Sequence, residues 1–253
     1  MDASPDQPLN ALGLPYPDFV RAARERGFGS GQTERAYNEI FREGKREAIA
    51  GGGRVLARVE IAPIVRELSE EVPEGVTTKF VQRLDSPAQL GKAEQLGIPH
   101  LDIESVIIPM VGRTGKRTHT LCVSSQVGCA MGCGFCETAQ MGLIRSLTAE
   151  EIVGQWYAAT HVKGARIDNI VFMGMGEPLD NAEEVIRAIG VLSSDQGPGV
   201  AMSRITISTV GRVDGLRRLN KVVKQHGWRR LGLAVSVNAP NDSVRSAIMP
   251  INR

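Results

Sequence analysis

The chain has 253 residues, 42% of them hydrophobic, which is enough to bury one sizeable core or a small domain joined to a larger one. Its 30 lysines and arginines nearly balance 28 aspartates and glutamates, so the formal charge of +2 excludes a polyelectrolyte protein, and any nucleic-acid contact must come from local patches. Four cysteines, a polar N-terminus and no run of roughly eighteen apolar residues predict a cytoplasmic protein without membrane contact.

The N-terminal segment, residues 1–75, is expected to form a small helical domain. Apolar residues recur with helical spacing at 19–23 and 36–41, which predicts two short amphipathic helices. A glycine break at 51–53 precedes Ile61, Val65 and Leu68, whose spacing predicts a third helix that ends at Glu70-Glu71. Basic residues of this segment are interpreted as a solvated face, with an RNA-binding surface as the alternative: Arg21, Arg24, Arg26, Arg42, Lys45 and Arg46.

Residues 76–117 are expected to form a β-rich connecting segment. Side chains alternate in character over 77–84, and a second β-rich stretch covers 103–111. The polar residues 85–100 between them contain helix-like stretches. Glu104 falls inside the second predicted strand, where, taken alone, it is an ordinary outward-facing carboxylate.

Residues 118–253 show a series of β then α units, which predicts an α/β fold with parallel strands. Strands are expected at 120–124, 169–173, 204–208 and 231–237, and helices at 182–192 and 213–224. Thr148-Ala149-Glu150-Glu151 has the form of a capping box that begins a further helix. The count stops at about four units and the sequence ends soon after a short predicted helix, which we interpret as an interruption of a longer chain.

Polar and glycine-rich segments follow three of these predicted strands. They are 174–178, Ser208-Thr209 and 236–238. In parallel α/β sheets the chemistry lies at the carboxyl ends of the strands. These segments are therefore expected to converge on one site.

Three of the four cysteines, Cys129, Cys133 and Cys136, have C-x3-C-x2-C spacing in a stretch that also contains Gly132 and Gly134. Closely spaced thiolates in a loop of this kind are suited to a soft metal centre. Three thiolates leave one iron of a [4Fe–4S] cluster open, whereas structural zinc prefers four closed ligands. Cys122 could complete a zinc site, which is the less favoured alternative, and a purely structural role for the thiols is less favoured still.

The pattern C-x3-C-x-aromatic-C resembles the signature of the radical S-adenosylmethionine (SAM) superfamily. The flanking stretches resemble the RlmN/Cfr group of RNA methyltransferases, which act on C2 or C8 of adenine, and the similarity extends from about Thr78 to the end. The stretches that carry it are 122–129, 172–178, 208–211, 239–242 and 249–253. The resemblance implies a partial (βα) barrel of the radical SAM type.

The resemblance also assigns site residues. Cys129, Cys133 and Cys136 would ligate a [4Fe–4S] cluster whose open iron SAM chelates. Phe135 would lie near the SAM adenine, and Gly176 and Glu177 would meet the SAM amino end. The rest of SAM would contact Ser208, Ser236, Val237 and Asn238.

The implied reaction is methylation of adenine C2 in 23S rRNA, with tRNA as a second substrate. In this group a methyl-carrying cysteine donates the carbon that a 5′-deoxyadenosyl radical activates. Cys122 matches the cysteine that resolves the protein–RNA adduct, and Glu104 matches the proton acceptor. An electron donor such as flavodoxin or ferredoxin and a monomeric state are expected.

Two departures from the group stand out. The methyl-carrying cysteine has no counterpart among the four cysteines here, and Asn238 stands where the group usually has histidine. An amide can still donate and accept hydrogen bonds. The alternative function is therefore an iron–sulfur RNA-binding paralogue without methyl transfer, and a zinc-stabilised RNA-binding protein comes third.

Overall fold

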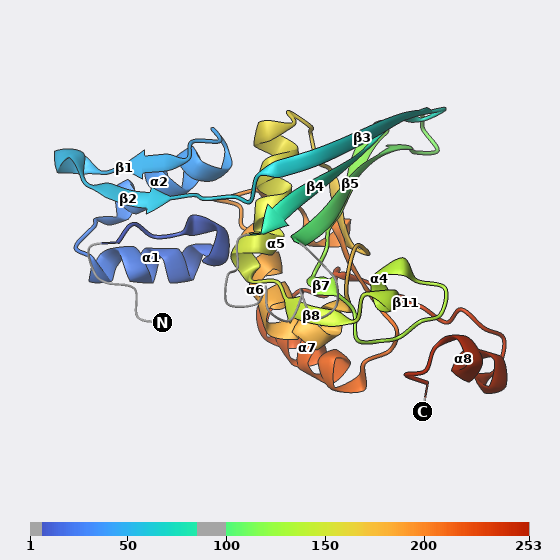
Figure 1. Ribbon diagram of the computed structural model, residues 1–253. Helices are drawn as coiled ribbons and strands as arrows, with labels where there is room; N and C mark the ends of the chain where they lie inside the picture. Colours follow the sequence, from blue (N-terminus) through green and yellow to red (C-terminus); the bar gives the residue numbers. More distant parts are fainter. Residues whose placement is uncertain (1–6, 85–99, 253) are drawn as a thin grey trace.

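The computed structural model describes residues 7–84 and 100–252. One sheet of seven strands runs through its centre, and two of the helices beside it, α5 and α6, separate it from a smaller N-terminal unit (Figure 1). The elements that build the larger part are β3 (Ile64–Val72), β4 (Gly75–Leu84), β5 (Leu101–Val111), β6 (Arg117–Cys122), β7 (Gln126–Gly128), α4 (Glu137–Gln140), β8 (Leu143–Ser146), α5 (Ala149–Tyr157), β9 (Asn169–Phe172), α6 (Ala182–Leu192), β10 (Ile205–Thr209), α7 (Val213–His226), β11 (Gly232–Val235) and α8 (Asp242–Ile248).

The seven strands follow the order β11-β10-β9-β6-β5-β4-β3. The first four are parallel to one another, as the alternation of strands and helices predicts. The last three are antiparallel and extend the same sheet through β5 and β6. The fold is thus α/β with an open sheet in the described residues, and no closed barrel forms among them. The division into residues 1–75, 76–117 and 118–253 stays a prediction. Strand β6 crosses the predicted boundary between residues 117 and 118.

One predicted element is wrong. The stretch expected to form a third helix is strand β3, which pairs antiparallel with β4 over almost its whole length. Val65 and Leu68, whose spacing predicted the helix, are 43% and 65% exposed. Apolar residues at helical spacing therefore do not mark a buried face here, and pairing with the neighbouring strand decides the conformation. Helix-like stretches were expected within 85–100, and residues 85–99 of this segment lie outside the described residues.

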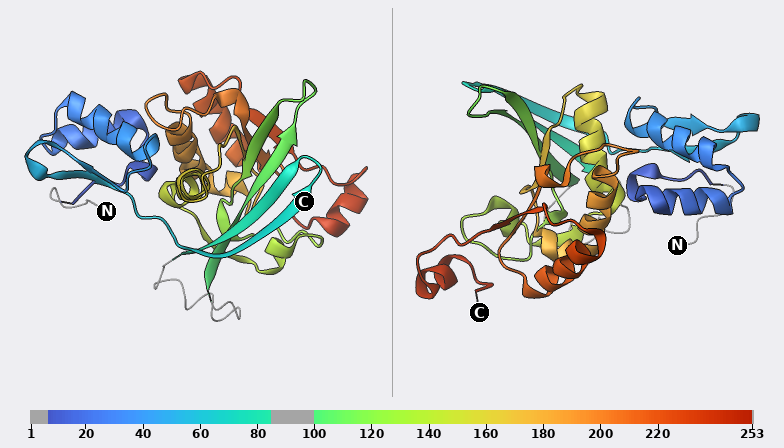
Figure 2. Two further views of the ribbon diagram at one scale, coloured as in Figure 1. Left: turned by 90° about the horizontal axis from the view of Figure 1, so that it is seen from above. Right: turned by 180° about the vertical axis from the view of Figure 1, so that it is seen from behind.

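The N-terminal unit consists of α1 (Tyr16–Glu25), α2 (Ser30–Phe41) and a short hairpin of β1 (Glu47–Ile49) and β2 (Val55–Arg58). The two predicted helices are confirmed, and the hairpin was not predicted. Figure 2 shows this unit packed beside α5 and α6 on the side away from the sheet. Its aromatic residues belong to the same hydrophobic core as the sheet and helices.

Specific contacts join this unit to α5 and the π-helical turn Ala158–Val162 that continues it. The Tyr157 hydroxyl donates to the Gly44 carbonyl at 2.7 Å, and His161 Nε2 lies 3.0 Å from the Phe41 carbonyl oxygen. The Phe41 and Trp156 rings are 6.2 Å apart between centroids. The same helix begins at the capping box the sequence predicts, because the Glu151 amide donates to Thr148 Oγ1 and the Thr148 amide donates to Glu151.

None of the described helices combines the length and apolar character that a membrane crossing requires.

Candidate metal and cofactor site

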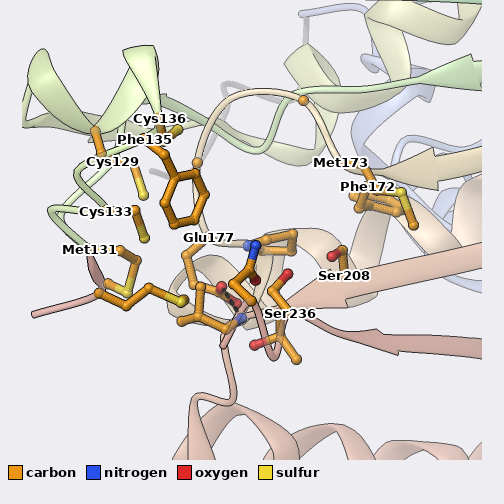
Figure 3. Close-up of a pocket in the computed structure, with 18 residues that line it drawn as sticks. Cys129, Met131, Cys133, Phe135, Cys136, Phe172, Met173, Glu177, Ser208 and Ser236 are labelled. Carbon is orange, nitrogen blue, oxygen red and sulfur yellow. Dashed lines mark hydrogen bonds between the residues drawn. The ribbon is translucent and has the colours of Figure 1, made fainter. Parts of the chain in front are cut away.

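The loops after β9, β10 and β11 meet the cysteine loop around one cavity of about 310 Å³. This is the convergence at the carboxyl ends of parallel strands that the sequence predicts. Figure 3 shows the cysteines on one side of the cavity, Ser208 and Ser236 across from them, and the Phe135 ring between. Residues that line it include Cys129, Met131, Cys133, Phe135, Cys136, Gly174, Gly176, Glu177, Ser208, Thr209, Val210, Ser236, Asn238 and Met249.

The cysteine loop is closed at its base by the hairpin of β7 and β8. Gly128 has φ +75°, and a Cβ there would lie 1.8 Å from the Gly142 carbonyl oxygen, so only glycine fits this neck. The Cys129 amide donates to that same oxygen at 3.0 Å. Beyond the neck, the Cys136 amide donates to the Cys133 carbonyl at 3.1 Å, which folds the second half of the loop back on itself.

Burial and mutual proximity shape the chemistry of the thiols. Cys129 and Cys133 are 7% and 6% exposed. Burial raises the pKa of the Cys129 thiol, and the neighbouring thiols Cys136 and Cys133 raise it further. Burial and the Cys136 thiol raise the pKa of Cys133, while the positive charge of Arg245 lowers it. A bound cation that shares their charge would therefore favour the thiolate forms of Cys129 and Cys133.

The donor set fits an iron–sulfur cluster. All three thiols of the loop line one cavity, and Cys122 does not. Among residues 7–84 and 100–252 no three His, Cys, Asp or Glu side chains are gathered closely enough to form a ready metal-ion site. Cys129, Cys133 and Cys136 would hold the cluster, and no fourth cysteine lines this cavity.

Glu177 connects two of the loops around the cavity. It is 2% exposed, and its carboxylate accepts hydrogen bonds from the Leu179 amide at 3.0 Å and the Val210 amide at 2.9 Å. Burial raises the pKa of this carboxyl, while hydrogen bonds from Val210, Thr209 and Leu179 oppose the rise. Glu177 thus fixes the loop after β9 against the loop after β10, and it lines the cavity.

Gly176 precedes it in a conformation that requires glycine. Its φ is +101°, and a Cβ would lie 2.6 Å from the Cβ of Gln126. The Gln126 side chain accepts a hydrogen bond from the Glu177 amide at 2.9 Å. The turn after β9 is therefore packed directly against the segment that leads into the cysteine loop.

Only some of the residues predicted to contact SAM from the opposite wall line the cavity. Ser208, Ser236 and Asn238 line the cavity, whereas the side chain of Val237 is 60% exposed and does not line it. Asn238 has φ +57°, the left-handed conformation that asparagine tolerates better than most residues. Phe135 lines the cavity and is 57% exposed.

Glu104 and Cys122 lie outside the residues that line the cavity. They occupy neighbouring strands β5 and β6, where Cys122 pairs with Val106. Lys79 Nζ donates to Glu104 Oε1 at 2.8 Å. Burial raises the pKa of the Cys122 thiol, and a hydrogen bond with the backbone of Met173 opposes the rise. Their catalytic roles stay predictions.

The structure adds two residues that the sequence did not single out. Met249 is fully buried and packs with Cys129 and Cys133, and it lines the cavity. Arg245 on α8 hydrogen-bonds to backbone carbonyls of the loops after β10 and β11. Met249 begins the stretch 249–253 that carries part of the resemblance but was assigned no role there, and Arg245 lies outside those stretches.

With this geometry established, comparison with known proteins identifies the family. Residues 123–253, about half of the chain, match the Radical SAM superfamily. The chain belongs to the radical SAM superfamily. Membership implies, in general terms, a [4Fe–4S] cluster and SAM, in agreement with the three-thiol loop.

Solved and curated relatives agree with this assignment. A crystal structure of a radical SAM methyltransferase from Sphaerobacter thermophilus superimposes with a TM-score of 0.75 at 30% identity, covering 97% of this chain and 68% of that one. A probable dual-specificity RNA methyltransferase RlmN 1 from Protochlamydia amoebophila is 37% identical over 97% of this chain and 64% of its own length. A dual-specificity RNA methyltransferase RlmN from Alkalilimnicola ehrlichii is 43% identical over 74% of this chain and 46% of its own. The chain thus spans less than two thirds of these curated relatives.

Proposed function

We propose that this chain is a radical SAM RNA methyltransferase of the RlmN type. Its substrate is C2 of an adenine in 23S rRNA, with tRNA as a second substrate. The observation that carries the proposal is the shared cavity: the three-thiol loop and the ends of three consecutive parallel strands line one space. The names of the relatives, which are RNA methyltransferases, support RNA as the substrate class.

A [4Fe–4S] cluster held here would supply the one-electron reduction that cleaves bound SAM, and the residues of this chain bind and orient the reactants. Cys129, Cys133 and Cys136 hold the cluster. Glu177 presents a carboxylate to the ammonium group of SAM, and Phe135 offers an apolar ring to the adenine. Ser208, Ser236 and Asn238 supply polar contacts, and Val237 contributes through its backbone.

Glu104 and Cys122 are proposed to act on the RNA adduct, as proton acceptor and resolving thiol respectively. They lie on adjacent strands of the sheet, and the backbone of Met173, which lines the cavity, hydrogen-bonds with Cys122. We further propose that residues 1–75 contact RNA and that 76–117 connect them to the catalytic segment 118–253. A cytoplasmic monomer reduced by flavodoxin or ferredoxin completes the proposal.

A second candidate is an iron–sulfur RNA-binding protein without methyl transfer. All four cysteines are already placed, three in the loop and Cys122 on β6, so these 253 residues contain no further cysteine to carry a methyl group. Under this hypothesis the cluster forms and RNA binds, but no methylated adenine accumulates.

Anaerobic reconstitution followed by iron, sulfide and zinc analysis tests the cluster. We expect about four irons per chain, as a [4Fe–4S] cluster requires. Replacement of Cys129, Cys133 or Cys136 by alanine should abolish iron uptake, whereas Cys122→Ala should retain it. Stoichiometric zinc without iron, lost in Cys122→Ala, would instead show the four-cysteine zinc site.

Two product assays then separate the remaining candidates. Release of 5′-deoxyadenosine after reduction in the presence of SAM shows radical generation, which a purely structural cluster does not support. Mass spectrometry of adenosine from treated rRNA and tRNA identifies methyl transfer and its position. Radical generation without methylated adenine would favour the second candidate.

A further inference from the structure

Arg245 joins the two halves of the cavity wall. Its guanidinium donates to the Val210 carbonyl at 2.8 Å, to the Ser236 carbonyl at 3.2 Å and to the Val237 carbonyl at 3.1 Å. A fourth hydrogen bond goes to the side chain of Asn252. One planar group therefore holds the loop after β10, the loop after β11 and the segment after α8 in a single arrangement.

The other half of the wall is attached through the helix that carries Arg245. The Met249 amide donates to the Arg245 carbonyl at 2.7 Å, and the Gly134 amide of the cysteine loop donates to the Ile248 carbonyl at 2.9 Å. The side chain of Met249 is fully buried against Cys129 and Cys133. The end of α8 thus touches the cysteine loop directly.

These contacts form a continuous connection between the groups that would hold the cluster and the loops that would hold SAM. The helix itself is short, and its N-terminus is capped by Asn241, whose side chain accepts from the Val244 amide at 3.0 Å. Without the guanidinium, α8 would keep its cap and its contact with Gly134 but lose its attachment to Val210 and Ser236.

We propose that Arg245 is a positioning residue that sets the cysteine loop in register with the SAM-binding loops. The inference rests on the proposed function, since it concerns SAM bound beside a cluster at this cavity. A planar guanidinium reaches four acceptors in fixed directions, whereas a lysine ammonium supplies a point charge with rotatable donors. A comparison of arginine with lysine at position 245 therefore distinguishes an effect of positioning from an effect of charge.

The test compares Arg245→Met and Arg245→Lys with the unaltered chain. Each protein is reconstituted anaerobically, its iron content and unfolding midpoint are measured, and SAM affinity is obtained by titration. The change that SAM causes in the EPR spectrum of the reduced cluster is recorded in parallel. Arg217→Met serves as the matched control, because Arg217 is 75% exposed on α7 and pairs across one turn with Asp214 at 3.3 Å.

We expect all variants to take up iron and SAM affinity to fall at least about tenfold in both Arg245 variants, a loss of about 1.4 kcal/mol. The SAM-dependent EPR change should weaken in the same two proteins and stay intact in Arg217→Met. Since lysine keeps the charge and the aliphatic stem, Arg245→Lys decides the question if Arg245→Met does not fold.

Two results would overturn the inference while the proposed function stands. They are unchanged SAM affinity in Arg245→Met, or full rescue by lysine, which would assign only a charge effect. If the unaltered chain itself neither takes up a cluster nor binds SAM, the proposed function fails instead.

Discussion

Glu177 and Arg245 hold the same residue from opposite sides. The Val210 amide donates to the Glu177 carboxylate at 2.9 Å, and the Val210 carbonyl accepts from the Arg245 guanidinium at 2.8 Å. A buried anion and a half-buried cation thus fix the backbone at the point where the loop after β10 borders the cavity. Charge-assisted hydrogen bonds of this kind are stronger than those between neutral groups.

The first prediction concerns the charge of Glu177. Burial raises the pKa of its carboxyl in the folded chain, so the stability it contributes is present below the ordinary carboxyl pKa and is lost as the pH rises through the folded value. The unfolding free energy of the unaltered chain, relative to Glu177→Gln, should therefore fall as the pH rises from 4 toward neutrality. Urea unfolding of the cluster-free proteins across this range measures it.

At neutral pH, Glu177→Gln should also bind SAM at least about tenfold more weakly, since an amide presents no negative charge to the ammonium group. Glu183→Gln is the control: Glu183 pairs with Arg218 on the surface and lies outside the lining of the cavity. Equal SAM affinity in Glu177→Gln and the unaltered chain would show that the carboxylate only ties the loops together.

Alanine substitutions at two glycines distinguish the cost of backbone strain from the cost of a steric clash. Gly176 and Gly211 have φ of +101° and +107°, but a Cβ at 176 would meet Gln126 at 2.6 Å, whereas a Cβ at 211 meets no atom within 4 Å. Gly211→Ala should therefore cost about 1–3 kcal/mol from strain alone. Gly176→Ala should cost a further ~1–3 kcal/mol from overpacking.

The measurement is again urea unfolding of the cluster-free chain. The prediction concerns the difference in unfolding free energy between the two variants, because the backbone strain is common to both. Equal destabilisation would mean that the segment at Gln126 moves freely aside, and that the turn after β9 is not rigidly packed against it.

Gln155 on α5 anchors the segment between β6 and β7, which leads to the cysteine loop. It is completely buried; its side chain accepts from Ser105 Oγ and from the Ser124 amide, both at 2.8 Å, and donates to the Ser124 carbonyl at 2.9 Å. Gln155→Leu leaves buried polar groups unpaired and should lower the unfolding free energy by ~2–4 kcal/mol. Chemical denaturation measures it.

Asn38→Ala provides the comparison for this prediction, because within the described part of the chain the Asn38 side chain donates a single, solvent-exposed hydrogen bond, to the Glu34 carbonyl. It should change stability by less than about 0.5 kcal/mol. A similarly small effect of Gln155→Leu would show that water replaces the lost partners.

His161 gives a pH dependence of the opposite sign. Burial lowers its pKa below 6.5, so its neutral form contributes stability that is present above the unfolded pKa and lost as the pH falls through the folded value. His161→Gln keeps an amide donor for the Phe41 carbonyl but does not titrate. Between pH 7 and pH 5 the unaltered chain should lose more unfolding free energy than this variant; parallel losses in urea titrations would refute the prediction.

The local signals in the sequence explain how much of this fold could be predicted. The bounds of α6 were predicted from apolar periodicity, and the start of α5 from the capping box at Thr148, because both signals lie within one element. Strand β3 was missed because its conformation depends on pairing with β4, and its exposed apolar residues imitate a helical stripe. Local patterns cannot report a partner elsewhere in the chain.

The site shows the same division. Spacing identified Cys129, Cys133 and Cys136, and the prediction of parallel strands indicated that the loops at their carboxyl ends converge on one site. Arg245 and Met249 were not predicted as site residues, because their contacts join segments that are adjacent only after folding. The positive φ of Asn238 also has no signature in its neighbours, although it gives a conformational reason for asparagine at that position.

The neck at Gly128 and Gly142 has a further consequence for the cysteine loop. Bringing the two ends of a loop together carries an entropic cost, and here the hydrogen-bonded hairpin of β7 and β8 joins those ends through the protein's own backbone. Metal binding that must also close its own loop is coupled to folding, as in small zinc domains. In this chain the backbone pairing of β7 and β8 already joins the ends of the cysteine loop, so we expect removal of a bound cluster to leave the surrounding fold intact.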